Sequence, residues 1–260
     1  ICVLSVCRGR EAVNRHGCAV YRRAVSPKRH LPARFGARGT PSGEKSAMRV
    51  RTVQVTPLQQ NCTLIEDPDT KRAVVVDPGG DAEALAEALK DFEVEAILLT
   101  HGHLDHAGGA DALRDLLSTR QGKPVPMLGP DERDRFLLTS IEQQAAAFGL
   151  SGMRNAHPDR MLNDGEVLNL LNRTIKVAHV PGHTPGHVVF IMRPEKLAIV
   201  GDTLFRGVIG RTDFAYGDHE GLIAAIREKL LTLPDDVTVV PGHGLPTTIG
   251  EERRSNPFFQ

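Results

Sequence analysis

Short apolar runs alternate with segments of helical periodicity along most of this chain. Polar and apolar residues alternate over residues 49–55 (RVRTVQV), which predicts a half-buried strand. The β-branched run at residues 72–80 (RAVVVDPGG) stops at Pro and Gly, as short buried strands do. Apolar residues three and four apart over residues 81–92 predict an amphipathic helix, with Asp81 as its candidate N-cap.

The remaining segments follow the same two patterns. We expect further strands at residues 62–66, 95–100, 166–172, 174–180, 187–193, 196–202 and 237–244. We expect further helices at residues 109–120, 131–149 and 218–233. Strands and helices therefore alternate first, strands then dominate, and a helix returns near the end. Two β-sheets packed face to face with helices outside accommodate this order, so we expect an α/β fold.

Residues 1–47 differ from the rest. They carry ten Lys and Arg against Glu11 and Glu44, and they lack sustained apolar periodicity. Such a segment cannot bury enough surface to order itself, so we expect a basic, disordered leader and a single domain over residues 48–260. An Arg-rich, acid-poor leader is also typical of transit peptides. Because the chain begins with Ile1, the alternative is that Met48 is the true start and the leader plays no part in catalysis.

The charge and the cysteine content of residues 48–260 argue against several classes of protein. Of the chain's 32 basic and 32 acidic residues, 22 and 30 lie in residues 48–260, which leaves a net charge of −8. This argues against a nucleic-acid partner, and no apolar run reaches the roughly 18 residues that cross a bilayer. Cys62 is the single cysteine of the domain, so it forms no disulfide there and should pack as a small buried side chain. We expect a cytoplasmic protein, or an organellar one if the leader directs transit.

Four potential metal ligands crowd into LLTHGHLDHAGG (residues 98–109). They directly follow a predicted strand and are His101, His103, Asp105 and His106. Four such residues within six positions are improbable as a chance arrangement on a surface loop. Alternate residues such as His101 and His103 can point the same way, whereas the adjacent Asp105 and His106 diverge. One segment can therefore serve two neighbouring metal positions. Imidazole and carboxylate ligands suit zinc, iron or manganese in an open catalytic site.

Three further candidates follow strand-like runs and lie beside glycine. They are His183 in HVPGHTPGH, Asp202 in AIVGDTLF and His243 in VVPGHGLP. Loops that follow strands can aim their side chains into one shared cleft. His187, also in the first of these segments, is interpreted as a residue that supports the site rather than a ligand.

The motifs THGHLDH, PGHTPGH, GDTLF and PGHG, in this order, resemble the metallo-beta-lactamase superfamily over nearly all of residues 49–260. The resemblance implies a four-layer αβ/βα sandwich with a dinuclear metal centre at one edge of its sheets. It assigns His101, His103 and His183 to the first metal and Asp105, His106 and His243 to the second. Asp202 would bridge both. We expect two divalent ions, zinc first, with iron or manganese as alternatives.

Such a centre implies hydrolytic chemistry. Two cations lower the pKa of a shared water, as zinc alone lowers it to about 7, and so supply hydroxide at neutral pH. One cation can also polarise the substrate carbonyl. Asp105 could additionally orient the hydroxide, which makes it the catalytic candidate.

The segment GDTLFRGVIGRTDFAYGD (residues 201–218) is similar to a loop of glyoxalase II-like thioesterases, in their small bacterial, hydroxyacylglutathione hydrolase-like branch. The similarity implies that Arg211 and Asp213 organise the active-site wall through an Arg–carboxylate interaction and that Phe205 packs beneath the metal loop. Asp213 and Phe205 are interpreted as structural supports rather than substrate contacts. A thiolate leaves readily, since a thiol pKa is about 8.5, so we expect a small-molecule acyl thioester such as S-lactoylglutathione.

Other functions stay open on the same scaffold. A persulfide dioxygenase-like oxidoreductase would share the GRTDF segment but hold one iron. A phosphodiesterase or nuclease could use the same two metals, and a non-catalytic binding module is a further alternative. Full-length glyoxalase II holds glutathione with a C-terminal helical domain, whereas 17 residues follow His243 here, so glutathione specificity is open. The sequence carries no signal for an oligomeric state.

Overall fold

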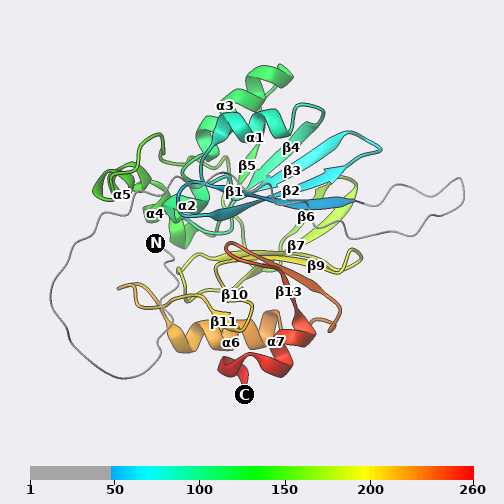
Figure 1. Cartoon of the computed structure of the whole chain (residues 1–260), viewed down its shortest axis with the longest axis vertical. Helices are drawn as coiled ribbons and strands as arrows, with labels where there is room; N and C mark the ends of the chain where they lie inside the picture. Colours follow the sequence, from blue (N-terminus) through cyan, green and yellow to red (C-terminus); the bar gives the residue numbers. More distant parts are fainter. Residues whose placement is uncertain (1–47) are drawn as a thin grey trace, which may run out of the picture.

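Two β-sheets face each other, and helices cover the outer face of each (Figure 1). The computed structural model describes residues 48–260, so the interpretation of residues 1–47 as a disordered leader lies outside the described residues. The layers run helix, sheet, sheet, helix, which is the αβ/βα sandwich expected from the sequence (Figure 1).

The first sheet has five strands in chain order. They are β1 (Arg49–Val55), β2 (Gln60–Asp67), β3 (Arg72–Val76), β4 (Glu93–Leu98) and β5 (Met127–Leu128). β1, β2 and β3 pair antiparallel, and β3, β4 and β5 pair parallel. β1 is half-buried as predicted, but its burial does not alternate strictly, because Val50 packs between the sheets while Val53 and Val55 pack on the helix-covered face. β2 and β3 are almost wholly buried because the sheet is covered on both faces.

The second sheet has six strands in the order β13-β12-β9-β8-β7-β6. They are β6 (Val167–Leu170), β7 (Arg173–His179), β8 (Val188–Met192), β9 (Leu197–Gly201), β12 (Thr238–Pro241) and β13 (Thr247–Thr248). β9 and β12 are parallel, with Gly201 opposite Pro241, so the residues that follow them leave the sheet at the same edge. A small hairpin, β10 (Leu204–Phe205) and β11 (Val208–Ile209), follows β9.

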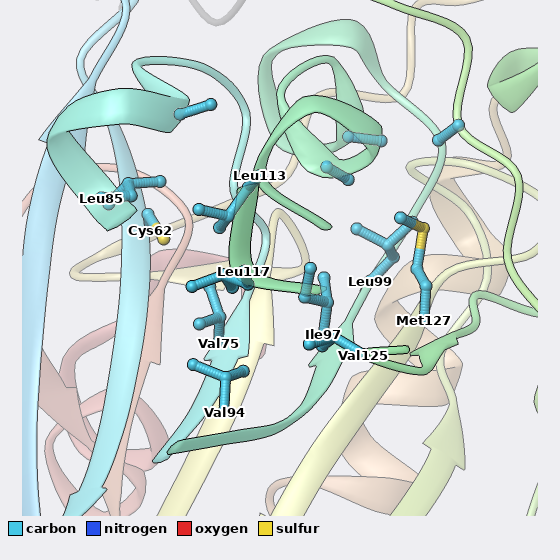
Figure 2. Close-up of a cluster of buried hydrophobic side chains, with 14 of the residues drawn as sticks. Cys62, Val75, Leu85, Val94, Ile97, Leu99, Leu113, Leu117, Val125 and Met127 are labelled. Carbon is cyan, nitrogen blue, oxygen red and sulfur yellow. The ribbon is translucent and has the colours of Figure 1, made fainter. Parts of the chain in front are cut away.

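The outer helices bury apolar faces against the sheets. α1 (Ala82–Ala88) and α3 (Ala110–Gln121) cover the first sheet, where Leu85, Leu113 and Leu117 pack with strand residues such as Val75 (Figure 2). Each of these fully buried side chains contributes about 1.5–3 kcal/mol to folding. Cys62 lies fully buried in the same cluster, as predicted.

The second sheet is covered in the same way by the C-terminal part of the chain. α6 (His219–Lys229) and α7 (Ile249–Ser255) contribute Leu222, Ile226 and Ile249 to its outer core. A third cluster, which includes Val74 and Phe190, fills the space between the two sheets. η2 (Pro257–Phe259) is the last element within the described residues. None of the helices within residues 48–260 is both long and apolar enough to cross a membrane.

Two helix predictions need correction. The single helix expected over residues 131–149 is broken into η1 (Glu132–Asp134), α4 (Arg135–Leu138) and α5 (Ile141–Ala147). The hydroxyls of Thr139 and Ser140 donate to backbone carbonyls of α4, and such side chains compete with helical hydrogen bonding. Asp81 does not cap α1, because its carboxylate accepts a hydrogen bond from Thr56 N at 2.7 Å instead.

Candidate metal centre

Four strand ends deliver all seven predicted ligands to one region. β4 leads to His101 and His103, and the four-residue helix α2 (Leu104–Ala107) carries Asp105 and His106. The other three follow the ends of β7, β9 and β12, in the order His183, Asp202 and His243. Six of the seven are buried and His243 is nearly so. The structure therefore brings together side chains that lie up to 142 positions apart.

Three imidazoles form the first group. His103 Nδ1 lies 3.0 Å from His101 Nε2 and 3.0 Å from His183 Nε2. Nitrogens bound at about 2.1 Å to one tetrahedral cation are separated by roughly 3.4 Å, so this spacing is close to that of ligands sharing an ion. Neutral imidazoles suit this role, and burial together with the neighbouring rings lowers the pKa of His101 and of His103 well below the ordinary value.

Asp105, His106 and His243 form the second group. Asp105 Oδ2 lies 3.2 Å from His243 Nε2 and 3.9 Å from His106 Nε2. Burial opposes ionisation of Asp105, but the charge on His106 and the hydrogen bond with His243 hold its pKa below the usual range. The second group is therefore a mixed carboxylate and imidazole set, with the three residues that the family resemblance implies.

Asp202 lies between the two groups. Its Oδ1 is 3.3 Å from His106 Nε2, and its Oδ2 is 3.7 Å from His183 Nε2 and 3.8 Å from His243 Nε2. One carboxylate thus faces ligands of both positions, which is the placement that a bridging residue needs.

Two buried polar atoms lack a hydrogen bond at the point where the two groups meet, which fits a site for divalent cations. Within residues 48–260, His106 Nε2 and Asp202 Oδ1 are buried, and they contact each other at 3.3 Å without forming a hydrogen bond. Buried polar atoms are costly without a partner, and these two face the space between the groups. Gly242 adjoins them. A Cβ at this position would lie 2.3 Å from Asp202 Oδ1 and 2.4 Å from His106 Cε1, so the close packing around the centre requires glycine.

Outer hydrogen bonds fix which ring nitrogen faces the centre. His101 Nδ1 donates to Thr100 Oγ1 at 3.0 Å, and His183 Nδ1 donates to the backbone carbonyl of Arg211 at 2.8 Å. Each Nε2 is then left without a proton and free to bind a cation. His187 acts from behind, because its Nε2 accepts from the backbone N–H of Asp202 at 3.1 Å and its ring stacks on His101. This placement is consistent with a supporting role.

Asp77 is a site residue that the sequence interpretation missed. Its Oδ2 accepts from His106 Nδ1 at 2.9 Å and from Thr100 Oγ1 at 2.6 Å, and its Oδ1 accepts from Thr100 N at 2.7 Å. Asp77 is also close enough to His101 and His106 to form a third possible ligand group. Since its carboxylate already accepts these three hydrogen bonds, it orients His106 rather than binding a cation. Its position directly after β3 was the available signal.

The predicted wall residues form a pair beside the first group. Arg211 donates to both carboxylate oxygens of Asp213 at 2.7 Å, and these hydrogen bonds lower the pKa of Asp213 to about 2. The Arg211 guanidinium also lies over the Phe214 ring, 4.7 Å from its centroid. The Asp213 side chain is 66% exposed, so the pair contributes little to the stability of the fold. Phe205 is buried in β10, opposite Val208 of β11.

Tyr216 is a second residue that the sequence interpretation missed. His103 uses Nδ1 toward the first group, so its Nε2–H donates to Tyr216 Oη at 2.8 Å. The Tyr216 ring stacks on Phe214 at a centroid distance of 5.2 Å, which holds the hydroxyl in place. The sequence carries no local signal for the contact between Tyr216 and His103, because the two residues are 113 positions apart and the fold brings them together.

Tyr216→Phe is expected to weaken the centre about tenfold, since the variant removes the acceptor that orients His103 and keeps the ring. Metal affinity and the hydrolysis rate should both fall by that order. Thr212→Val is the matched control, because it removes a hydroxyl–imidazole contact (Thr212 Oγ1 to His219 Nδ1, 3.2 Å) from the same loop without touching a ligand. Equal metal affinities in Tyr216→Phe and the wild type would contradict this role.

Comparison with known proteins identifies a family of metal-binding proteins, in agreement with the two groups of candidate metal ligands. Residues 55–243 match the family model of the metallo-beta-lactamase superfamily. The chain is 48% identical over 215 residues to hydroxyacylglutathione hydrolase GloC of Haemophilus influenzae, covering 82% of this chain and 98% of that protein. The solved BLEG-1 B3 metallo-beta-lactamase is 38% identical, with a TM-score of 0.73 over 82% of this chain and all of that one. The solved structure of TTHA1623 in a di-iron-bound form is 36% identical, with a TM-score of 0.70, and the match covers 80% of this chain and 98% of that one.

Proposed function

This chain belongs to the metallo-beta-lactamase superfamily, and we propose that the metallo-hydrolase acts on an acyl thioester of the hydroxyacylglutathione type. The observation that carries the proposal is the convergence of seven imidazole and carboxylate side chains into two adjoining groups. The similarity to GloC supports a thioester as the substrate. Zinc is the proposed metal, and the di-iron form of TTHA1623 supports iron as the alternative.

Each group would hold one cation. His101, His103 and His183 would bind the first, Asp105, His106 and His243 the second, and Asp202 would contact both. When bound, the cations supply hydroxide at neutral pH and polarise the carbonyl of the substrate. The Asp77 carboxylate orients the ring of His106 in the second group, and the backbone carbonyl of Arg211 orients the ring of His183 in the first group. Both rings are therefore oriented before the substrate binds.

Asp105 combines two tasks in this proposal. Its carboxylate lies beside His243 in the second group, and its pKa, which is below the usual range, keeps it ionised at neutral pH. An ionised carboxylate accepts a hydrogen bond from the attacking water and fixes the direction of its lone pair toward the acyl carbon. Asp105 thus serves as both a ligand and an orienting group.

The chemistry of the leaving group favours a thioester over an amide. A thiolate departs without protonation, because its conjugate acid has a pKa of about 8.5, whereas an amine needs a proton on leaving. We propose a small-molecule partner, with neither nucleic acid nor membrane, for a domain whose net charge is −8. A cytoplasmic location is part of the same proposal.

Two alternatives use the same centre. The 38% identity to BLEG-1 favours a β-lactam as the second candidate substrate. The GRTDF segment at residues 210–214 favours a persulfide dioxygenase-like reaction with a single iron. The dioxygenase-like reaction differs from the two hydrolyses in metal content and in oxygen uptake, and the two hydrolyses differ in the substrate that is cleaved. One set of measurements therefore separates the three reactions.

The test is a substrate panel on natively purified full-length protein with its metals quantified. S-lactoylglutathione, an acyl-CoA and a β-lactam are assayed for hydrolysis, and glutathione persulfide is assayed for oxygen uptake. We expect two metals per chain and hydrolysis of a thioester at least tenfold faster than that of the β-lactam. One iron per chain with oxygen uptake would overturn the proposal in favour of the dioxygenase.

A further inference from the structure

A buried aspartate outside the proposed ligand set connects the two loops that carry the first group. Asp134 is the last residue of η1 and is fully buried. Its Oδ2 accepts from Gly102 N at 2.9 Å and from Thr184 Oγ1 at 2.7 Å, and its Oδ1 accepts from Gly186 N at 2.5 Å. Gly102 separates His101 from His103, and Thr184 directly follows His183. One carboxylate therefore holds both loops.

The backbone around Asp134 is shaped for this contact. A Cβ on Gly102 would lie 3.0 Å from the Asp134 carbonyl oxygen and 2.7 Å from Leu137 Cβ. A Cβ on Gly186 would lie 2.6 Å from Asp134 N. Asp131 N also donates to Gly186 O at 3.0 Å, so the segment of residues 131–134 docks on the second loop through backbone as well as side chain. Glycine at both contact points lets the loops reach the carboxylate.

From these contacts, we infer that Asp134 is a positioning residue that sets the spacing of His101, His103 and His183 and thereby the affinity of the first metal position. Its three acceptor contacts all reach the loops of this group. The second group is held by other residues, because Asp77 orients His106 and backbone and side-chain bonds from Asn61 hold residues 241–244. Loss of Asp134 should therefore affect the two positions unequally.

The chemistry of the contact explains why an aspartate is required. Three donors converge on two oxygens, and an ionised carboxylate offers acceptors on both. An asparagine has the same shape but only one acceptor oxygen, so its amide N–H₂ would face at least one donor of a ligand loop. Buried donors left without an acceptor are costly, and the loop would shift to relieve them.

The test compares zinc binding by Asp134→Asn and by the wild type. Metal-free proteins are titrated with zinc, and the ring nitrogens of ¹⁵N-labelled histidines report which position fills. We expect one of the two equivalents to bind about 10- to 100-fold more weakly in Asp134→Asn, as outer-sphere changes commonly do. The signals of His103 and His183 should stay at their metal-free positions after one equivalent, while those of His106 and His243 shift.

Two further variants separate positioning from general destabilisation. Asp111→Asn is the matched control, because Asp111 is similarly buried and accepts from His157 N and Nδ1, away from both ligand loops. It should leave both zinc equivalents unchanged. Thr184→Val removes one of the three contacts and should give a smaller selective loss, which keeps the test decisive if Asp134→Asn folds poorly.

The possible outcomes are distinct. Unchanged affinities in Thr184→Val and Asp134→Asn, or an equal weakening of both equivalents in Asp134→Asn, would overturn the inference. The inference rests on the proposed metal ligands and is independent of the thioester as substrate. A wild-type protein that binds no pair of zinc ions would instead refute the proposed centre itself, so the two failures are distinguishable.

Discussion

Replacing Asp202 with alanine is expected to lower the hydrolysis rate by about 10³-fold or more and to reduce bound metal below two ions per chain. Asp202 faces ligands of both groups, so its loss removes a contact from each cation and leaves His106 Nε2 without its nearest carboxylate. Bound cations contribute several kcal/mol of transition-state stabilisation, and each 1.36 kcal/mol is a factor of ten in rate. The checks are turnover of the thioester found in the substrate panel and elemental analysis.

A control variant that also replaces an aspartate with alanine tests whether the loss of one negative charge anywhere in the chain lowers the rate or the metal content. Asp236→Ala removes an exposed carboxylate that pairs with Lys196 at the surface, and it should leave both rate and metal content unchanged. The result that would contradict the site assignment is wild-type turnover in Asp202→Ala. His103→Ala should behave like Asp202→Ala, since it removes the ring at the centre of the first group.

Removing the metals with a chelator is expected to abolish turnover and to lower the melting temperature by roughly 10 °C. A cation that binds only the folded chain stabilises it by about 4 kcal/mol at a free concentration a thousand times Kd. For a domain of this size, 1 kcal/mol corresponds to about 2–4 °C. Thermal unfolding and activity are measured before and after chelation.

Reconstitution provides the control for this experiment. Adding back two equivalents of zinc should restore both the melting temperature and the rate, whereas magnesium, which prefers all-oxygen coordination, should restore neither. A chelated protein that is metal-free and still fully active would exclude the proposed mechanism.

The seven candidate ligands could be found from the sequence because each follows a strand and lies near glycine. That local signal is strong when several histidines crowd together, as they do at residues 101–106. The paired sheets were also predictable, because buried β-branched runs and helical periodicity alternate in a recognisable order. The four-residue α2 and the two-residue strands β5, β10, β11 and β13 are too short to leave a periodic pattern.

The residues that orient the ligands were harder to find. Tyr216 meets His103 across 113 positions, and Asp134 reaches Gly186 across 52, so these contacts depend on how the loops pack. Asp134 was assigned to a continuous helix, and the helix breaks downstream at Thr139 and Ser140. Asp77 is the exception, since it follows β3 in the same way that Asp202 follows β9.

The hydrogen bond from His183 to residue 211 is made by a main-chain oxygen. Every amino acid supplies that oxygen, so side chains at position 211 can be exchanged while the imidazole keeps its orientation. Asp213 and Phe214, which pack around Arg211, likewise contribute none of the seven ligands. We therefore expect that substitutions at positions 211, 213 and 214 can change substrate selectivity, by engineering or in evolution, while the seven ligands stay the same.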